Sequence, residues 1–484
     1  MKIAWTIAGS DSGGGAGVQA DLHTFRDFGL HGATVVTCVT AQNSVALTDN
    51  HVVPASNVRA QIQALGDDLP PDAIKIGALG SAENAAVVID FLDGLGDRRP
   101  FVVWDPVRQA TVGGELGTLP DDTVRALLRA VDAVTPNEEE LAVLGGTNVP
   151  QAVSAIRERG PKHVFITGGH GHTPGRDHWF GDTKTFLIQS DTVPGNGAHG
   201  GGCSLSSALA AARVREDEDS APVLAHMYVR QGLRALAAAA DAPGAGRPAL
   251  PHLGWPGRFE DLPKVVDAGS ELSETRFRPL DRPLGLYAVV PDVDWLKRCV
   301  ELGLDTVQLR VKDIPSTVRR RIVAESVDAT RGTPTRLFVN DYWREAVEAG
   351  AYGVHLGQED LTDADLPALA RAGIRLGIST HSYYEIARAH AWTPSYIAIG
   401  PIYATTTKPM KFDPQGVDRL QRWVELLKDQ YPLTAIGGID RARAPGIMAT
   451  GVDSIAVVRA ITEASDPATA VAELRAGMDH HQVP

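Results

Sequence analysis

Short β-branched runs alternate with longer segments rich in Ala, Leu and Arg along almost the whole chain. This alternation is typical of βαβ units, in which helices connect the strands of a parallel sheet. The pattern fails between residues 242 and 283, a stretch rich in proline. A chain of 484 residues suits two cores of about 200–250 residues. We therefore expect two α/β domains, at 1–265 and 284–484, joined by a linker at 266–283.

The second half contains eight strand-like runs, and each is followed by a segment long enough to form a helix. Eight such units in about 200 residues is the count of a (β/α)8 TIM barrel, whose active site lies at the carboxyl ends of the strands. The expected barrel strands are 286–290, 306–310, 336–339, 353–355, 375–378, 396–399, 433–436 and 454–457. Strands expected in the first half include 4–8, 33–38, 73–76, 101–104, 133–134 and 163–167.

Composition narrows the class of partner. A formal net charge of −13 argues against a nucleic-acid binder, which would need a basic face. Three widely spaced cysteines fit a reducing compartment. No segment approaches the roughly 18–20 apolar residues of a membrane span, and the N-terminus lacks signal-peptide features. We expect a cytoplasmic protein with small-molecule partners, without nucleic acid or membrane; the sequence leaves open whether it forms a homo-oligomer.

Cationic and amide side chains alternate in the QLRVK segment of the second half. On an extended strand, Gln308, Arg310 and Lys312 would point the same way. Arg supplies forked donors and Lys a point charge, so the three could hold a diphosphate. A solvated, charged face of an edge strand is the alternative for this triplet alone.

Carboxylates follow the next two expected strands, in FVNDYW and GVHLGQED. Asp341 follows Asn340 at the end of an apolar run, and Asp360 lies beyond the neighbouring run. Two such carboxylates can share a magnesium ion, with phosphate oxygens and water completing its shell. Taken singly, Asp341 could be a helix N-cap and Asp360 part of a turn.

Two later loops also suit anions. GPIYATTTK ends a hydroxyl run in Lys408, and AIGGID places the pair Gly437 and Gly438 after a strand, where backbone N–H groups could approach a phosphate.

These motifs, with LGIST and SIAVVRAIT, resemble the thiamine phosphate synthase family over about residues 284–478. The resemblance implies that this half couples 4-amino-2-methyl-5-pyrimidinylmethyl diphosphate to a thiazole phosphate and releases pyrophosphate. It implies a Mg²⁺ site on Asp341 and Asp360, and charge stabilisation by Arg310 and Lys408. It places the pyrimidine diphosphate on Gln308, Arg310, Lys312, Asn340, Ser379 and Lys408, and the thiazole phosphate on Thr405, Thr406, Thr407, Gly438, Val458 and Arg459. Arg459 departs from the small hydroxyl residue usual in the family.

Glycine-rich turns mark the first half. GSDSGGGAGVQAD follows the first expected strand, and AHGGGC leads into a helix whose first turn holds Cys203. Free N–H groups and the helix dipole there favour an anion and are expected to lower the thiol pKa. A small buried structural cysteine is the alternative. After another strand, Asn137 and Glu140 could orient Mg-ATP or cap a helix.

Together with AQN, KIGAL and DPV, these turns resemble the ribokinase-like family, closest to hydroxymethylpyrimidine/phosphomethylpyrimidine kinase, over about residues 1–263. The resemblance implies a three-layer α/β/α domain that phosphorylates the pyrimidine alcohol and then its monophosphate with ATP. It implies substrate contacts from Asp11 and Gln42, Cys203 as base, an anion hole at Gly200, Gly201 and Gly202, and nucleotide contacts from Asn137 and Glu140.

Four departures from the kinase pattern lie near its chemistry. Gly201 replaces the hydroxyl residue of HGTGC, Ala78 replaces a methionine, and Thr111 and Thr167 stand near or at positions of lysines. Losing two lysines should weaken charge stabilisation. We expect an active kinase; specialisation to one phosphorylation, a non-catalytic pyrimidine-binding module and a pyridoxal kinase-like enzyme are the alternatives.

Overall fold

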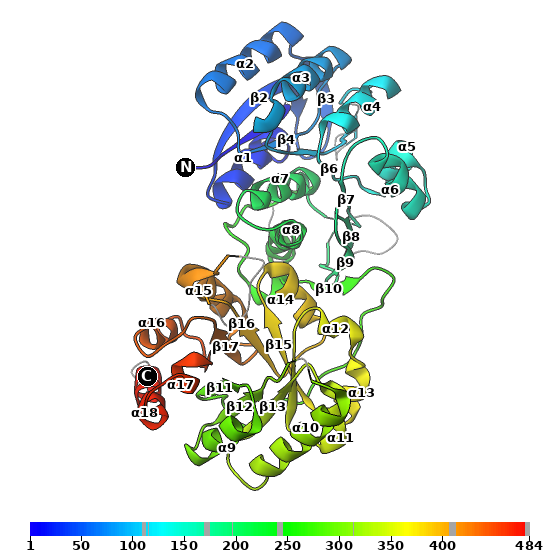
Figure 1. The fold of residues 1–484 in the computed structure, drawn as a ribbon. Helices are drawn as coiled ribbons and strands as arrows, with labels where there is room; N and C mark the ends of the chain where they lie inside the picture. Colours follow the sequence, from blue (N-terminus) through cyan, green and yellow to red (C-terminus); the bar gives the residue numbers. More distant parts are fainter. Residues whose placement is uncertain are drawn as a thin grey trace. The chain divides into compact units, whose positions relative to one another are not determined.

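The computed structural model describes residues 1–108, 113–114, 116–168, 175–195, 197–239, 245–312, 314–405 and 413–479. It divides the chain into two compact units, Met1–Glu271 and Leu272–Pro484 (Figure 1). Each unit has its own sheet and its own hydrophobic core, so each is described by itself.

A ten-stranded sheet forms the middle layer of the first unit, in the order β10-β9-β8-β7-β6-β5-β4-β1-β2-β3. The six neighbouring strands β7, β6, β5, β4, β1 and β2 pair in parallel. Antiparallel pairs extend the sheet by β8, β9 and β10 at one edge and by β3 at the other. The bounds are β1 Ile3–Asp11, β2 His31–Gln42, β3 Leu47–Val52, β4 Ala73–Ile76, β5 Phe101–Trp104, β6 Ala133–Val134, β7 His163–Ile166, β8 Arg176–Phe180, β9 Thr185–Gln189 and β10 Lys264–Asp267.

Helices cover both faces of this sheet, which gives the expected three-layer α/β/α arrangement (Figure 1). Helix α7 packs between α1 and α8, while α3 packs between α2 and α4, and α5 pairs with α6. The bounds are α1 Gly17–Asp27, α2 Ala55–Asp68, α3 Ala82–Gly94, α4 Asp121–Ala130, α5 Glu138–Gly145, α6 Val149–Arg157, α7 Gly201–Arg213 and α8 Ser220–Ala238.

All six strands expected from sequence in the first unit are present, but the edge strands β3 and β10 and the interior strands β8 and β9 were not among them. Strand β3, LTDNHV, is mostly exposed and carries no apolar alternation. Strand β10 begins at Lys264 and pairs with β9 inside the proline-rich stretch where no strand was expected. Strand β3 is held by main-chain pairing at an edge, which leaves little hydrophobic signal in the sequence, whereas β10 buries two valines but is only four residues long.

The second unit is a closed barrel of eight parallel strands, in the order β11 to β18, and all eight correspond to expected strands. Tyr287, Phe338 and Tyr396 fill its interior with Leu284, Ala398 and Ala456. The strands are β11 Tyr287–Val290, β12 Thr306–Leu309, β13 Arg336–Asn340, β14 Gly353–Leu356, β15 Arg375–Thr380, β16 Tyr396–Ile399, β17 Leu433–Ile436 and β18 Ser454–Val457.

Helices follow the barrel strands in βα alternation, which confirms the expected TIM-barrel architecture. Their bounds are α9 Val293–Glu301, α10 Ser316–Thr330, α11 Trp343–Ala349, α12 Asp360–Asp363, α13 Leu366–Arg371, α14 Tyr383–His390, α15 Gly416–Leu427, α16 Ala444–Met448, α17 Arg459–Thr462 and α18 Pro467–Asp479. In the described parts of the chain, no helix is both long and apolar enough to cross a membrane.

The segment expected as a linker has structure at both ends. Val266 and Asp267 belong to strand β10 of the first unit. Phe277 is buried, and the carbonyls of Arg278 and Pro279 accept hydrogen bonds from Ser395 and Arg375 within the second unit. The division between the units, after residue 271, lies between these two structured ends.

Candidate active sites

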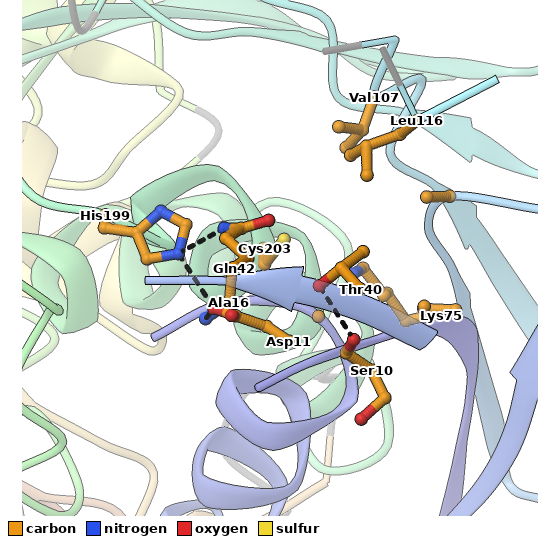
Figure 2. Close-up of a pocket in the computed structure, with 14 residues that line it drawn as sticks. Ser10, Asp11, Ala16, Thr40, Gln42, Lys75, Val107, Leu116, His199 and Cys203 are labelled. Atoms are coloured by element: carbon orange, nitrogen blue, oxygen red, sulfur yellow. Dashed lines mark hydrogen bonds and ion pairs between the residues drawn. The ribbon is translucent and has the colours of Figure 1, made fainter. Parts of the chain in front are cut away.

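A pocket of the first unit lies where the carboxyl ends of β1 and β2 meet the start of helix α7 (Figure 2). The parallel pairing of β1 with β2 and β4 brings their ends to one edge. Val107 and Leu116 line another part of the pocket wall. The lining residues are Ala8, Gly9, Ser10, Asp11, Ala16, Gly17, Thr40, Gln42, Lys75, Ala78, Val107, Leu116, His199 and Cys203.

Asp11 organises the glycine-rich turn between β1 and α1. Its Oδ1 accepts a hydrogen bond from the N–H of Gly13, and its Oδ2 accepts from the N–H groups of Gly15 and Ala16. Its Oδ2 also lies 2.8 Å from Nε2 of His199. Desolvation raises the pKa of Asp11, but the bonds from His199 and the turn amides outweigh it and lower the pKa overall.

His199 connects this turn to Gln42, whose Nε2 lies 3.0 Å from Nε2 of His199 (Figure 2). The turn before helix α7 must approach the first turn closely. A Cβ on Gly200, whose φ is 82°, would lie 1.8 Å from the carbonyl oxygen of Gly15. Only glycine fits there, so the two glycine turns can pack directly against each other.

Cys203 lies in the first turn of α7, as expected, but the expected direction of its pKa was wrong. Desolvation raises the pKa of the thiol to about 12, against the lowering effect of nearby Lys75. Burial removes water from the thiolate, and this cost exceeds what the helix terminus and one cation supply. The thiol also hydrogen-bonds Asp105, whose own pKa is raised to about 6 by burial.

Beneath the thiol lies a buried ion pair that sequence reasoning did not assign. Nζ of Lys75 lies 2.9 and 3.0 Å from the two carboxylate oxygens of Asp21, and both side chains are fully buried. Thr6 and Ser207 donate further hydrogen bonds to Asp21. Lys75 belongs to the KIGAL motif and Asp105 to the DPV motif. A charged residue within or next to an apolar run was the sequence feature from which this buried charge cluster could have been predicted.

Asn137 and Glu140 form a capping box at the start of helix α5. The Asn137 side chain accepts from the N–H of Glu140, and Oε2 of Glu140 accepts from the N–H of Asn137. Desolvation and the nearby Asp105 carboxylate raise the pKa of Glu140 to about 8. The capping alternative therefore holds in the structure, and a nucleotide contact stays a prediction.

The remaining kinase positions are placed as follows. Gly201 and Gly202 lie in the first turn of α7 with open space beside each Cα. Ala78 lines the pocket. Thr167 forms a bridge with Asn137, and Thr111 lies outside the described residues.

In the second unit, the expected cationic strand is shorter than predicted. Strand β12 ends at Leu309, so Gln308 is buried in the barrel and donates a hydrogen bond to the Tyr287 hydroxyl. Arg310 is half-buried and Lys312 is exposed beyond the strand. Both cations act on Asp341, so the structure brings them to the predicted carboxylate site.

Asp341 and Asp360 approach each other beyond β13 and β14. Desolvation, the charge of Asp360 and a hydrogen-bonding contact with Asp360 raise the pKa of Asp341 to about 6, while Arg310 and Lys312 oppose the rise. Asp341 has a φ of 64°, an uncommon backbone conformation for a non-glycine residue. Oδ2 of Asp360 accepts from the N–H of Gly357.

Polar residues of β14 and β15 lie beside this pair. Asn340 is the buried last residue of β13. Nε2 of His355 lies 2.8 Å from Oγ of Ser379, and Nε2 of Gln358 donates to the Ser379 carbonyl. Burial, with Arg310 nearby, lowers the pKa of His355 to about 3. Sequence analysis gave His355 no role.

The loops expected to bind the thiazole phosphate are described in part. Thr405 is half-buried; Thr406, Thr407 and Lys408 lie outside the described residues. Gly438 packs against the segment before Thr405, because a Cβ there would lie 2.8 Å from the Ala404 carbonyl oxygen. Val458 caps helix α17, and Arg459 is exposed at its first residue.

Comparisons with known proteins agree with this division. The family model described as phosphomethylpyrimidine kinase matches residues 11–246, and the model described as thiamine monophosphate synthase matches residues 286–461. A thiamine-phosphate synthase from Neisseria meningitidis serogroup A is 53% identical over 203 residues, which are 42% of this chain and 98% of the relative.

Solved structures resemble the first unit. A phosphomethylpyrimidine kinase from Clostridium difficile 630 is 30% identical, with 48% of this chain and 99% of that chain covered and a TM-score of 0.41. A pyridoxal kinase from Staphylococcus aureus in complex with ADP is 25% identical, with 55% and 99% covered and a TM-score of 0.48.

The first unit has a three-layer α/β/α fold and matches the phosphomethylpyrimidine kinase model, while nearly the whole length of a synthase relative aligns with the second. The chain belongs to the thiamine-phosphate synthase family in its second unit and joins that domain to a phosphomethylpyrimidine kinase domain, which makes it a bifunctional transferase of thiamine biosynthesis.

Proposed function

We propose that the first domain uses ATP to phosphorylate hydroxymethylpyrimidine and then its monophosphate, and that the second domain consumes the resulting diphosphate. The second domain would join that diphosphate to a thiazole phosphate and release pyrophosphate. The observation that carries the proposal is the Asp341–Asp360 carboxylate pair, which faces the cations Arg310 and Lys312 beyond the barrel strands.

The carboxylate pair fits a magnesium ion. Desolvation, followed by the charge of Asp360, raises the pKa of Asp341, and a divalent cation would relieve the repulsion between the two carboxylates. The described residues contain no group of three or more protein ligands suited to a metal. This suits Mg²⁺, which takes one or two carboxylates and completes its shell with phosphate oxygens and water. When bound, Mg²⁺ would neutralise diphosphate charge.

The other residues of the barrel site would position the reactants. Arg310, Lys312 and Lys408 would stabilise the negative charge of the departing diphosphate. The pyrimidine amino group can feed electrons to the exocyclic methylene, so the C–O bond breaks before the thiazole nitrogen forms the new C–N bond. Gln308, Asn340 and Ser379 would orient the pyrimidine diphosphate. Thr405, Thr406, Thr407, Gly438, Val458 and Arg459 would receive the thiazole phosphate.

In the kinase pocket, Cys203 would accept the proton of the substrate hydroxyl, with Asp105 and Lys75 next to it. The raised pKa of the Cys203 thiol means that the thiolate, the form that accepts a proton, is disfavoured in the pocket as the structure shows it. Gln42 and Asp11 line the pocket where the pyrimidine would bind. The N–H groups of Gly200, Gly201 and Gly202 would hold the transferred phosphoryl group, and Asn137 and Glu140 would lie near Mg-ATP.

Synthase chemistry is tested with chemically supplied pyrimidine diphosphate and thiazole phosphate. We expect Asp341→Ala and Lys408→Ala to abolish thiamine phosphate formation and Asp363→Ala, an exposed carboxylate on α12, to leave it unchanged. Retention of more than about a tenth of wild-type kcat, which corresponds to about 1.4 kcal/mol of barrier, would contradict the proposed roles.

Kinase chemistry is tested on the intact chain with ATP, magnesium and hydroxymethylpyrimidine, by measuring ADP and both phosphorylated products. We expect both products, loss of both in Cys203→Ala, and retention of both in Cys38→Ala, which changes a buried thiol of the same unit. Pyrimidine binding without ADP formation would indicate a binding module instead. Faster turnover of pyridoxal than of the pyrimidine would indicate a pyridoxal kinase.

A further inference from the structure

A chain of hydrogen bonds runs through the interior of the barrel to the candidate synthase site. Nε2 of Gln308 donates to the Tyr287 hydroxyl at 3.0 Å, and that hydroxyl lies 2.8 Å from the Tyr396 hydroxyl. The Tyr396 hydroxyl lies 2.7 Å from Nδ1 of His355, and Nε2 of His355 lies 2.8 Å from Oγ of Ser379. Five side chains from strands β11, β12, β14, β15 and β16 are therefore linked in one line.

The line is built into the core. Tyr287 and Tyr396 are 1% and 0% exposed, and Gln308 and His355 are also buried. The His355 ring stacks on Tyr396, which in turn meets Tyr287 edge to face. Water is therefore excluded from the links between Gln308 and His355, and each polar atom must be satisfied by its neighbour in the line.

The direction of the bonds follows from counting protons. Each tyrosine hydroxyl has one proton and can also accept. The Tyr287 oxygen accepts from Gln308, so the Tyr287 proton has a hydrogen-bond partner among the described residues only if it is donated to Tyr396. Gln308 also acts as a donor toward Tyr396, so the acceptor that remains for the Tyr396 proton among the described residues is Nδ1 of His355.

The tautomer of His355 is fixed by this direction. A buried imidazole whose partners are hydroxyls is neutral, because no carboxylate contacts it among the described residues to stabilise a charge. With Nδ1 accepting, the single ring proton is on Nε2 and is donated to Oγ of Ser379. The Ser379 hydroxyl accepts this bond and keeps its own proton for a group outside the line.

We propose that His355 is a positioning residue, which with Tyr287 and Tyr396 makes the half-buried Ser379 hydroxyl an obligatory hydrogen-bond donor toward the pyrimidine diphosphate. The inference rests on the proposed placement of that substrate at Ser379. If the Ser379 hydroxyl could rotate freely, it could donate its proton to His355. Its oxygen lone pairs would then face the diphosphate, and the negative charge of the diphosphate would repel them. The line removes that choice before the substrate arrives.

The tautomer is read directly by NMR of the intact chain with ¹⁵N-labelled histidine. The signal lost in His355→Gln assigns the residue. We expect the Nε2–H tautomer in the wild-type chain and a mixture of tautomers in Tyr396→Phe. An Nδ1–H tautomer or a doubly protonated ring in the wild-type chain would contradict the proposed hydrogen-bond relay from Gln308 to Ser379. The direction of the hydrogen bonds derived above would then be wrong.

Kinetics test what the line does for the substrate. We expect Tyr396→Phe to lower kcat/KM for the pyrimidine diphosphate about ten-fold, the effect of one hydrogen bond to a charged group. The KM for the thiazole phosphate should not change. In a Ser379→Ala background the same substitution should have no further effect on kcat/KM. The control is Tyr431→Phe, which removes a hydroxyl that contacts His390 2.8 Å away elsewhere in the barrel unit and should leave kcat/KM unchanged.

The outcomes separate the two ideas. If Ser379→Ala leaves kcat/KM unchanged, the proposed substrate contact is wrong and the relay has no function. If Ser379→Ala is impaired but Tyr396→Phe lowers activity equally with and without Ser379, the contact stands and the relay is refuted. Unfolding temperatures measured for every variant identify losses caused by misfolding, and the wild-type tautomer decides the relay in that case.

Discussion

Lys75 illustrates how much a single buried charge can matter in this protein. Its Nζ lies among the carboxylates of Asp21 and Asp105 and the thiol of Cys203, and Lys75 lines the kinase pocket. Although burial lowers the pKa of Lys75, the charge of Asp21 outweighs burial and raises it overall. The ammonium therefore stays charged and offsets carboxylates that would otherwise be buried alone.

We predict that Lys75→Met destabilises the first unit by about 3–5 kcal/mol, because it leaves Asp21 buried without its cation. Denaturant unfolding followed by a probe in the first unit measures the change. The control is Lys2→Met, which breaks an ion pair with Asp72 that is largely exposed on the lysine side and should cost less than about 1 kcal/mol. Equal effects of the two substitutions would contradict the importance of burial.

Glu140 provides a pH-dependent test at the same scale. Its pKa is about 8 in the folded chain and about 4.3 in an unfolded chain. The unfolded state therefore releases this proton first, and the stability contributed by protonated Glu140 is lost as pH rises from about 4.3 to about 8. We predict that Glu140→Gln raises the free energy of unfolding by about 2 kcal/mol at pH 8, with little effect at pH 4. This is less than the full linkage value, because solvent reaches part of the Glu140 side chain and screens its charge.

The comparison is made by denaturant unfolding at the two pH values. The glutamine introduced in this variant is not charged, but its side-chain oxygen can still accept from the Asn137 N–H, so the capping box survives. A stability gain that is independent of pH would show that the carboxylate of Glu140 does not carry this cost.

At the scale of elements, the buried parallel strands were predictable, whereas the strands that pair only antiparallel, β3, β8, β9 and β10, were not. The eight barrel strands and the six central strands of the first unit carry continuous apolar runs, which the sequence displays directly. Strand β3 is mostly exposed, so its position depends on pairing with β2. The residues of the carboxylate pair were predictable from their place after strands, whereas the Cys203 pKa depends on burial that no local pattern reveals.

The start of helix α7 gives a prediction for an element. Gly201 stands where the kinase family has a hydroxyl residue, and a Cβ added there meets nothing within 4 Å. We predict that Gly201→Thr folds normally and raises kinase kcat/KM several-fold, because a hydroxyl beside the transferred phosphoryl group adds one hydrogen bond to it. Steady-state kinetics with hydroxymethylpyrimidine check this. Gly94→Thr, in open space at the end of α3, is the control and should leave kinetics unchanged.

The whole molecule consists of two units with separate cores, and each carries one of the two sites. Nothing in the described kinase pocket comes from residues beyond Glu271, and the described barrel residues assigned to the synthase all come from beyond Leu272. Both activities should therefore survive separation if the cut respects strand β10, which a division at 265 would break.

We predict that residues 1–271 and 272–484, expressed separately, each fold and keep kinase and synthase activity respectively when given their own substrates. Shortening the first piece to 1–263 removes β10 and should lower its unfolding temperature by several degrees, since a lost edge strand removes the buried Val265 and uncovers the residues beneath it. Thermal unfolding and the two activity assays measure the outcome. Loss of synthase activity on separation alone would show that the barrel depends on the first unit.

The contact between Asp11 and His199 has a consequence for the growing chain. The two residues are 188 positions apart, and ribosomes add about 5–20 residues per second. The glycine turn of residues 13–17 therefore waits about 10–40 s before the segment that completes its pocket has been made. Until then the nascent first unit has Asp11 and the turn amides without the histidine that contacts them, so its pocket cannot be complete before translation has passed His199.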